Sequence, residues 1–367
     1  MPAAPPRTLP WLLLAAALAA CAPTTKRVDV DPGLVEEEAR KQRALALQTQ
    51  MQRQARLTRI AYPILENAAL LCKDKTRLTI GALYVNTYSF SPELRAIAAE
   101  ELKLTDELTV MQVPPGSPGE IAGLRERDVL LALNSQPVPR GEFATKAFFE
   151  ITQTELKAGV PVNLTVRRGE AERTLVLNPD LICDYPVIVG PGDEVNAYAD
   201  GAKVVIQKGL MRFAESDEEI ALVVAHELAH NAMTHVQSQT TNYWIGSVVD
   251  ILAAAYGIST GGLFGSLAAN YYSKDFEAEA DYVGLYMLAR SGGRVDGAPL
   301  FWRRLAAEHP GSISRGGMLA SHPTTPERFV AMEATIKEIE AKRAANRPLL
   351  PDMEKSGAAE AAAEPAK

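Results

Sequence analysis

The sequence contains few of the residues that mark several common classes of protein. Among its 367 residues there are three Cys and five His, and Asp+Glu (45) outnumber Lys+Arg (38), for a formal net charge of −7. A nucleic-acid-binding chain normally shows a basic excess, so no nucleic-acid partner is expected. There is no internal repeat, Walker loop or dinucleotide fingerprint. Apolar residues make up 47% and charged residues 23%, a globular balance that excludes a wholly disordered chain.

Near the start, the run Trp11–Ala20 has only ten apolar residues, and about 20 are needed for a helix to cross a bilayer. With Arg7 before it, the run instead resembles the hydrophobic region of a secretory signal. It ends in Leu18-Ala19-Ala20-Cys21, which resembles a bacterial lipobox. We expect residues 1–20 to be removed as a lipoprotein signal peptide and Cys21 to carry the lipid. The alternative is an ordinary signal peptide in which Cys21 occurs by chance.

The residue after the lipobox indicates where the anchor would place the protein. Ala22 stands where Asp would resemble an inner-membrane retention signal. We therefore expect anchoring at the periplasmic face of the outer membrane of a Gram-negative bacterium, with residues 21–33 as a tether. An oxidising compartment favours a disulfide between the two remaining cysteines, Cys72 and Cys183. The alternative is two unpaired, buried thiols.

Composition divides the rest of the chain. Residues 34–75 are rich in Glu, Arg, Gln, Ala and Leu, all good helix formers, which predicts one or two amphipathic helices broken near Pro63. Residues 76–180 alternate short β-rich runs with Pro and Gly turns, which is typical of a small β-rich domain. Residues 181–340 contain all five His, and residues 341–367, rich in Ala, Glu, Pro and Lys, are predicted to be a disordered tail.

The β-rich segment contains the run Val113–Val138, VPPGSPGEIAGLRERDVLLALNSQPV. It resembles the core of a PDZ domain, in which a turn and a short helix precede a D-V-[IL]-x-x-[IL]-N strand, although Arg127 stands where the family often has Gly. A PDZ domain binds an extended peptide by adding it as a strand to a sheet edge. By this resemblance, the loop that holds the peptide carboxylate is Leu78-Thr79-Ile80-Gly81. The alternative is a PDZ fold that serves only as a spacer.

A helix that could carry a metal site is predicted from Ser216. This residue is followed by three acidic residues, a typical helix start, and the segment continues as IALVVAHELAHNAMTHV. His226 and His230 are four residues apart, so they share one helix face and can bind one Zn²⁺. Glu227 lies one position on, from which it can reach a zinc-bound water rather than the metal.

A second helical segment, FEAEADYVGLYMLA, offers the third ligand. Glu277 and Asp281 are also four residues apart and share a helix face. Glu277 can complete a His₂Glu set, because catalytic zinc sites have three protein ligands and one open position. Asp281, one turn later, can accept a hydrogen bond from a ligand His. Glu279 points elsewhere and is expected to be structural.

HExxH followed about 50 residues later by ExxxD, inside E-x-E-A-D-x-x-G, resembles peptidase family 48 of the metallopeptidases, a group of gluzincins. The segments Val195–Tyr198 and Ser321–Arg328 (SHPTTPER) resemble other parts of this family. The resemblance covers residues 181–340 and implies a mainly helical, zincin-type metallopeptidase domain. With a small β-rich PDZ domain inserted after the N-terminal helix, the expected fold class is α+β. The resemblance also makes His322 a candidate fourth ligand or switch; the alternative is that His322 only caps the final helix.

The same resemblance implies one Zn²⁺ per chain and hydrolysis of peptide bonds. The zinc-bound water would be the nucleophile and Glu227 the general base, while His322 or Arg328 could donate to the oxyanion. By analogy with the family, substrates would be misfolded or damaged proteins of the cell envelope, selected by the PDZ domain through free C-termini. The alternative is a PDZ-based periplasmic chaperone or adaptor whose peptidase domain is latent.

Other features lie outside these motifs. Residues Tyr243–Tyr272 carry one charge, Asp250, and many Gly, which favours a mobile lid over the cleft rather than a hairpin that touches the membrane. Site-2 intramembrane proteases also combine HExxH with PDZ domains, but their HExxH lies in a membrane span. Here acidic residues stand just before HExxH, which argues against that class of protease. His235 and His309 match no motif and are expected to be surface or structural residues.

Overall fold

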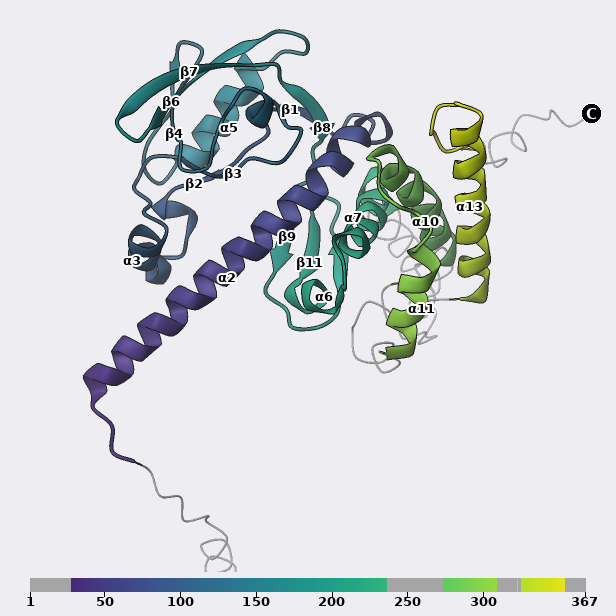
Figure 1. Ribbon diagram of the computed structural model, residues 1–367, viewed down its shortest axis with the longest axis horizontal. Helices are drawn as coiled ribbons and strands as arrows, with labels where there is room; N and C mark the ends of the chain where they lie inside the picture. Colours follow the sequence, from purple (N-terminus) through teal and green to yellow (C-terminus); the bar gives the residue numbers. More distant parts are fainter. Residues whose placement is uncertain (1–27, 236–272, 309–321, 323–324, 354–367) are drawn as a thin grey trace, which may run out of the picture.

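A computed structural model describes residues 28–235, 273–308, 322 and 325–353, and the structural statements below refer to these residues. The α+β fold expected from the sequence is confirmed: a β-rich unit and a mainly helical unit both contact the long helix α2, Pro32–Asn67 (Figure 1). None of the described helices is both long enough and apolar enough to cross a membrane. Cys21, His309 and the segment Tyr243–Tyr272 lie outside the described residues.

Helix α2 is one continuous helix, so the predicted break near Pro63 is wrong. The helix begins after Asp31, whose side chain accepts hydrogen bonds from the backbone N–H groups of Gly33 and Leu34. Pro63 removes one helical hydrogen bond, which costs about 3 kcal/mol or more in a helix interior. The turns around it bury Ile60 and Ile64 in the core of the helical unit, and this burial offsets the loss.

The β-rich unit is an antiparallel sheet with the strand order β2-β3-β4-β6-β7, to which β5 adds by pairing with β4. The strands are β2 Leu83–Val85, β3 Thr109–Gln112, β4 Val129–Leu133, β5 Gln136–Pro137, β6 Val162–Arg168 and β7 Ala171–Leu177. The helices of this unit are α3 Pro92–Glu101, α4 Pro118–Ile121 and α5 Ala144–Glu155 (Figure 1). The unit has an apolar core of its own, in which Phe148 is fully buried and contacts the ring of Tyr84.

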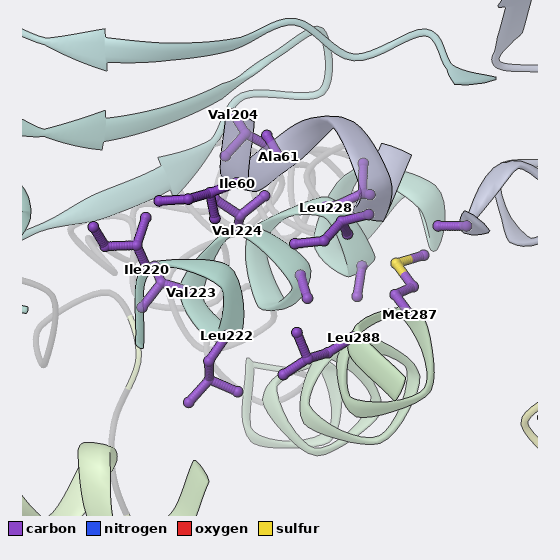
Figure 2. Packing of buried hydrophobic residues seen from close by; sticks show 14 of the residues in the cluster. Ile60, Ala61, Val204, Ile220, Leu222, Val223, Val224, Leu228, Met287 and Leu288 are labelled. Carbon is purple, nitrogen blue, oxygen red and sulfur yellow. The ribbon is translucent and has the colours of Figure 1, made fainter. Parts of the chain in front are cut away.

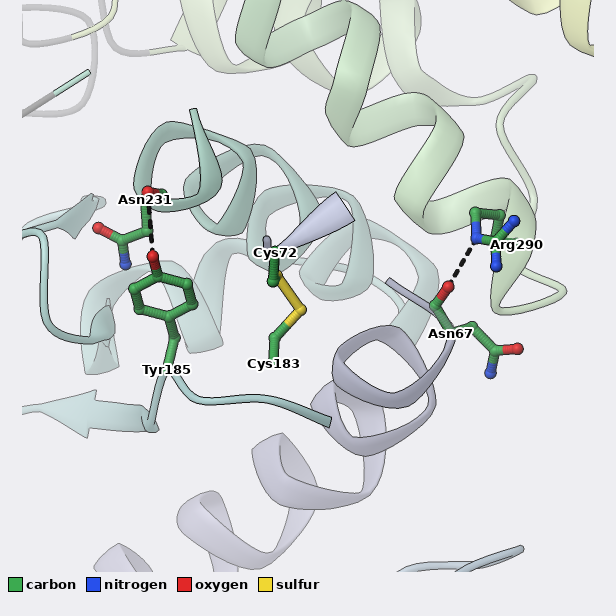
Figure 3. Close-up of a disulfide and its surroundings, with 6 residues drawn as sticks. All are labelled: Asn67, Cys72, Cys183, Tyr185, Asn231 and Arg290. Atoms are coloured by element: carbon green, nitrogen blue, oxygen red, sulfur yellow. Dashed lines mark hydrogen bonds between the residues drawn. A yellow bond between two sulfur atoms is a disulfide. The ribbon is translucent and has the colours of Figure 1, made fainter. Parts of the chain in front are cut away.

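Both ends of the β-rich unit meet at one place. Strand β1, Thr76–Thr79, pairs antiparallel with β8, Asp180–Cys183, so that Thr76 lies opposite Cys183. Beside this ribbon a disulfide joins Cys72 to Cys183, with 5.6 Å between their Cα atoms (Figure 3). Both cysteines are buried. We call this paired base of the unit, residues 72–79 and 180–183, the neck.

The helical unit combines a small mixed sheet with the helices that follow it. Strands β9 Val187–Gly190 and β11 Val204–Gln207 are parallel, and β10 Ala197–Ala199 is antiparallel to β11, in the order β10-β11-β9. The described helices are α6 Lys208–Phe213, α7 Asp217–Ala232, α10 Ser273–Arg290, α11 Ala298–Glu308 and α13 Pro326–Ala344. Ile60 and Ala61 of α2 lie in one apolar cluster with Val224 and Leu228 of α7 and Leu288 of α10 (Figure 2).

Side chains of α2 also cover the outer edge of β9. Gln54 donates from Nε2 to the carbonyl oxygen of Val187 (3.1 Å), and its Oε1 accepts from the N–H of Val189 (2.9 Å). With a further hydrogen bond from Nε2 of Gln50 to the carbonyl oxygen of Val189 (3.4 Å), these contacts take the place of a neighbouring strand and protect the edge. Helix α2 is thus fixed along the sheet of the helical unit.

The prediction that the chain is disordered from residue 341 is wrong for residues 341–353, which are folded. Helix α13 continues to Ala344, and the described residues after it fold back on the helix. Nζ of the buried Lys342 lies 2.9 Å from the carboxylate of Glu338 and 3.0 Å from that of Asp352, while Leu349 packs on the core. Composition alone did not predict these contacts, because a polar sequence gives no sign of the partners it meets. Residues 354–367 lie outside the described residues.

Candidate metal centre

Helix α7 carries the HExxH residues. Oγ of Ser216 accepts from the backbone N–H of Glu219 at 3.3 Å, and acidic residues fill the first turn, where they complement the helix dipole. From Leu222 to Ala232 every side chain is buried, which accounts for the continuous apolar sequence. His226, Glu227 and His230 are 2%, 0% and 5% exposed, so three polar side chains lie in the protein interior.

Helix α10 packs on α7 and brings Glu277 and Asp281 to the same place. The close approach depends on Gly284, where a Cβ atom would lie 3.1 Å from the carbonyl oxygen of Ala225 and 3.1 Å from Cα of His226. The sequence E-x-E-A-D-x-x-G therefore places two acidic side chains and the contact point with α7 on one helix. Both carboxylates are buried.

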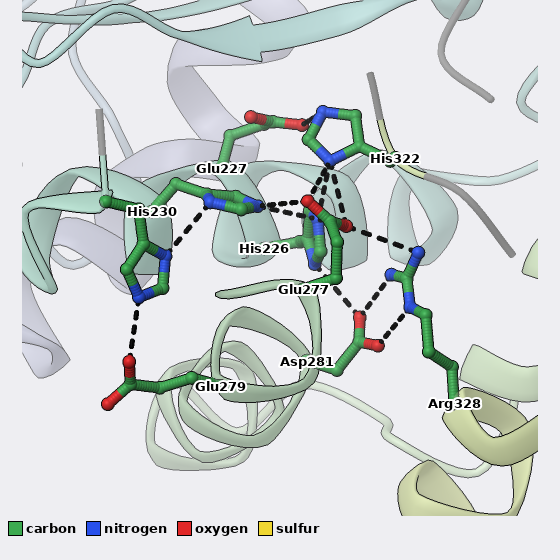
Figure 4. A network of polar contacts seen from close by, with 9 residues as sticks. His226, Glu227, His230, Glu277, Glu279, Asp281, His322 and Arg328 are labelled. Atoms are coloured by element: carbon green, nitrogen blue, oxygen red, sulfur yellow. Dashed lines mark hydrogen bonds and ion pairs between the residues drawn. The ribbon is translucent and has the colours of Figure 1, made fainter. Parts of the chain in front are cut away.

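Four donor atoms converge in this interior (Figure 4). Each of four residues offers one potential ligand atom, and these atoms all lie within 4.8 Å of one another. The residues are His226, His230, Glu277 and His322. Nε2 of His226 lies 3.2 Å from Nε2 of His230 and 3.3 Å from Nδ1 of His322. Glu277 lies 3.4 Å from His226 and 3.2 Å from His230. Tetrahedral zinc with bonds of about 2.0–2.1 Å separates its ligand atoms by about 3.3–3.4 Å, so this donor set fits one zinc ion.

Glu227 lies beside the donor set and is fully buried. Neither of its carboxylate oxygens has a hydrogen-bond partner among the described residues, and the 3.3 Å contact between Oε1 and Nε2 of His322 does not have hydrogen-bond geometry. Buried polar atoms in native proteins nearly always have a partner. A buried carboxylate that lacks a hydrogen-bond partner among the described residues at this point suits a group that acts on a water molecule in the site.

Asp281 and Arg328 surround the donor set. Asp281 lies 3.0 Å from Nδ1 of His226, the ring nitrogen that faces away from the other donors. Arg328 of α13 binds the Asp281 carboxylate through Nε and Nη2, at 2.8 and 2.9 Å, and its Nη1 lies 3.2 Å from Glu277. The guanidinium therefore holds the carboxylates of Glu277 and Asp281. The sequence had left open a different role for Arg328, as a donor to the oxyanion.

These contacts set the charge of the buried groups. Burial raises the pKa of Glu277, but His322, His226 and His230 outweigh this effect and lower the pKa well below its usual value. Burial also raises the pKa of Asp281, and contacts with His226 and Arg328 reverse the shift. Both carboxylates are therefore ionised at neutral pH, the form that binds a metal.

The two helix histidines differ. Burial lowers the pKa of His230 to about 4 and keeps it neutral. For His226, burial lowers the pKa, but Asp281 and Glu277 outweigh it and raise the pKa to about 10. Metal binding at His226 would therefore displace a proton.

For His235 the sequence allowed a surface or a structural role, and this residue is not at the surface. It is 2% exposed, its Nδ1 lies 3.0 Å from Nδ1 of His230, and its Nε2 lies 2.8 Å from Oε2 of Glu279. Sequence patterns did not predict this arrangement, because it joins a residue beyond the end of α7 to one on α10. The available signals were slight: His235 follows His230 by five positions, and Glu279 follows Glu277 by two.

The loop expected to hold a peptide carboxylate begins at the end of strand β1 and continues beyond it. Leu78 and Thr79 belong to β1, Ile80 is buried, and Gly81 has a φ of +66°. A Cβ atom at Gly81 would lie 2.5 Å from Cβ of Ser117, so the start of α4 requires glycine there. The loop also borders a cavity of about 390 Å³ whose other wall is formed by α2 and the segment around β9.

Known proteins resemble the chain in two separate regions. Residues 183–336 match the sequence model of "Peptidase family M48", and residues 109–168 match that of a "PDZ domain". The chain carries a peptidase family M48 domain. The four donor residues and Glu227 all lie within the M48 match, and the PDZ match covers strands β3 to β6 of the β-rich unit.

Curated relatives resemble part of the chain. The "Beta-barrel assembly-enhancing protease" of Escherichia coli (strain K12) is 30% identical over 152 residues, which is 37% of this chain and 31% of the relative. The "Mitochondrial metalloendopeptidase OMA1" of Arabidopsis thaliana is 31% identical over 150 residues, 39% of this chain and 30% of the relative. The chain thus spans about a third of the length of these relatives.

Solved structures also resemble part of the chain. The structure titled "HtrA-type protease AlgW with decapeptide" is 23% identical, with a TM-score of 0.23 and coverage of 29% of this chain and 30% of that chain. The HtrA3 PDZ domain bound to a phage-derived ligand is 22% identical, with a TM-score of 0.22 and coverage of 29% of this chain and 88% of that chain.

Proposed function

We propose that the M48 domain is a zinc-dependent endopeptidase in which Glu227 is the general base. The observation that carries this proposal is the buried Glu227 carboxylate, which has no hydrogen-bond partner among the described residues and lies next to four convergent donor atoms. Bound Zn²⁺ supplies Lewis acidity, which polarises a carbonyl group and acidifies water. His226, His230 and Glu277 hold one ion per chain, and Asp281 fixes the orientation of His226. Glu227 accepts a proton from water and returns it to the leaving amine.

His322 takes the fourth position of the donor set in this proposal. Its Nδ1 lies 2.9 Å from Oε1 of Glu277 and 3.3 Å from Nε2 of His226. A catalytic zinc site keeps one position open, so His322 has to move aside before water and substrate can enter. Of the two candidate donors to the oxyanion, Arg328 is already engaged with Asp281 and Glu277. We therefore assign this role to His322 once it has been displaced.

The same contact of His322 favours a second candidate function. With all four donor positions filled by side chains, the peptidase is latent, and the protein acts as a periplasmic chaperone or adaptor through its PDZ domain. Replacing His322 shows whether this residue is what keeps the peptidase latent.

Two features support recognition of extended polypeptides. Strand β10 is an outer strand of the described sheet and contacts α7, and a peptide added to a strand edge is bound through its main chain. Main-chain binding suits unfolded proteins of varied sequence. In the PDZ domain, Leu78-Thr79-Ile80-Gly81 would take a free C-terminus, and the cavity between this loop and α2 gives room for it.

The substrates that we propose are misfolded or damaged proteins of the cell envelope. The proposed location is the periplasmic face of the outer membrane of a Gram-negative bacterium, with lipid on Cys21 as the anchor. Support comes from the lipobox-like sequence, from a disulfide of the kind that persists in oxidising compartments, and from the name of the Escherichia coli relative, which refers to β-barrel assembly.

Digestion of unfolded casein by the purified full-length chain with zinc tests this function. We expect the wild type to cleave casein. Glu227→Gln should bind zinc equally and lose roughly 100-fold or more in rate, because it removes the base and no ligand. A Glu227→Gln variant as active as the wild type would refute the mechanism. If the wild type is inactive and His322→Ala is active, the latent form is the resting state. If both bind zinc and neither cleaves, the endopeptidase proposal fails and the adaptor function remains.

A further inference from the structure

His235 lies where the chain turns back after α7. The helix ends at Ala232, and Thr234 has a φ of +60°, a left-handed conformation that is an outlier for a β-branched residue. Beyond this turn, His235 is buried and its ring stacks on that of Phe276, with 4.6 Å between the ring centres. Unusual backbone conformations of this kind persist where the surrounding structure holds them, and they are concentrated at functional sites.

The hydrogen bonds around His235 run in one direction. His230 points Nε2 at the donor set, 3.2 Å from Nε2 of His226, and this nitrogen must be unprotonated to bind a metal. The proton of neutral His230 is therefore on Nδ1, which donates to Nδ1 of His235 at 3.0 Å. Nε2 of His235 then carries a proton and donates to Oε2 of Glu279 at 2.8 Å. Because an ionised carboxylate only accepts, the whole chain of donors has one consistent direction.

The other helix histidine is supported in a different way. Nδ1 of His226 meets the Asp281 carboxylate directly, at 3.0 Å. His230 meets an imidazole instead, and the carboxylate of Glu279 stands one side chain further out, where it is 38% exposed. Without His235, the buried Nδ1–H of His230 would lose this acceptor, and a ring turned to find another one would no longer present Nε2 to the donor set.

We propose that His235 and Glu279 are positioning residues that hold His230 in the tautomer and orientation that bind zinc. The proposal rests on the metal site proposed above. It goes beyond the expectations that Glu279 is structural and that His235 is a surface or structural residue. His235 and Glu279 act through His230. Neither residue is part of the donor set, and neither is the general base. Removing an outer partner of a ligand histidine typically changes metal affinity about 10–100-fold.

Zinc affinity of the full-length chain, measured by competition with a chromophoric chelator, tests the proposal. His235→Phe keeps an aromatic ring beside Phe276 but removes the acceptor, and we expect it to weaken zinc binding about 10–100-fold. His235→Asn places a carbonyl oxygen near the position of Nδ1 and should restore most of the affinity. Glu279→Leu leaves His235 without its acceptor and should weaken binding by a smaller factor.

A matched control is available at the same end of α7. The hydroxyl of Tyr185 donates to the carbonyl oxygen of Asn231 at 3.2 Å (Figure 3), so Tyr185→Phe removes one buried hydrogen bond without touching His230. Its zinc affinity should equal that of the wild type. The visible spectrum of the Co²⁺-loaded chain, which reports ligand geometry, should change in His235→Phe and stay unchanged in Tyr185→Phe.

The outcomes separate this inference from the proposed function. Equal zinc affinity of the wild type and a folded His235→Phe would overturn the positioning role and leave the metal site intact. A wild type that binds no zinc would overturn the metal site and this inference together. Urea unfolding in EDTA shows whether each variant is folded. If His235→Phe does not fold, Glu279→Leu decides, and wild-type affinity in that variant would overturn the proposal.

Discussion

Arg328 and Asp281 form a buried, two-point ion pair, with Nε 2.8 Å from Oδ2 and Nη2 2.9 Å from Oδ1 (Figure 4). Their side chains are 5% and 4% exposed. The pair connects α13 to α10, and Nη1 of Arg328 also reaches Glu277. The C-terminal helix is therefore part of the structure that holds the carboxylates of the proposed metal site.

Arg328→Ala should destabilise the folded chain strongly. It leaves two buried carboxylates without their cation, and breaking a buried pair on one side costs about 3–5 kcal/mol. Arg328→Lys should recover little of this free energy, because an ammonium group cannot bind a carboxylate at two points. Urea unfolding measures both variants.

The control for this experiment is Arg303→Ala. Arg303 pairs with Glu333 at the surface, where both side chains are 49% exposed, and such pairs contribute about 0–1 kcal/mol. A loss of stability in Arg328→Ala no greater than that in Arg303→Ala would contradict the structural role of the buried pair.

The zinc content of the protein should depend on Glu277. After dialysis, Glu277→Ala should contain much less zinc than the wild type, whereas Glu279→Leu should still bind one ion at saturating zinc. Because zinc binds the folded chain, EDTA should lower the unfolding temperature of the wild type; at a zinc concentration of about 1,000 times Kd the linkage amounts to about 4 kcal/mol. Glu277→Ala should show little response to EDTA. Equal zinc content in Glu277→Ala and the wild type, measured by elemental analysis, would exclude Glu277 as a ligand.

The disulfide of the neck should contribute substantially to stability. The bond between Cys72 and Cys183 spans a sequence separation of 111, and the chain-entropy model gives roughly 4–5 kcal/mol for a loop of this size, as an upper figure. The double variant Cys72→Ala/Cys183→Ala should therefore unfold at lower urea, and dithiothreitol should shift the wild type toward it without changing the variant. Peptide mapping without reduction should find the linked peptides. Two free thiols in protein isolated from an oxidising compartment would argue against the bond.

The lipid anchor predicts a change of location. Cys21→Ser should move the protein from the membrane fraction to the soluble periplasm, because the lipid is the proposed attachment. Ala22→Ser, which leaves the lipidated residue in place, is the control and should stay with membranes. If Cys21→Ser remains membrane-bound, the anchor is elsewhere in the chain.

The parts of the site that could be read from the sequence are those fixed by helix geometry. His226 and His230, and likewise Glu277 and Asp281, are four residues apart, so each pair had to share a helix face once the helices formed. The meeting of the two helices could be expected only from the resemblance to a known family. In the structure it depends on Gly284, which lets α10 approach the backbone of α7.

The features that the sequence did not predict depend on contacts beyond local periodicity. His235 reaches His230 because Thr234 takes a left-handed conformation after the helix has ended, and no spacing rule covers that turn. Pro63 is accommodated within α2 because Ile60 and Ile64 are buried against distant parts of the chain. Lys342 finds partners on both sides of the end of α13, in a segment whose composition indicated disorder.

The neck also bears on the order in which the chain can fold. Helix α2 precedes the β-rich unit and α7 follows it, yet the two helices share one apolar core. The β-rich unit draws its own core from a single continuous stretch of chain, and its ends meet where β1 pairs with β8. If this unit folds first, residues on either side of it become neighbours before the surrounding core has formed. Bringing the flanking segments together then requires closing a loop of only a few residues instead of one with a sequence separation of 111. The entropic cost of this step is lower by roughly 2–3 kcal/mol. An inserted domain would thereby act as an internal template for assembly of the domain that surrounds it.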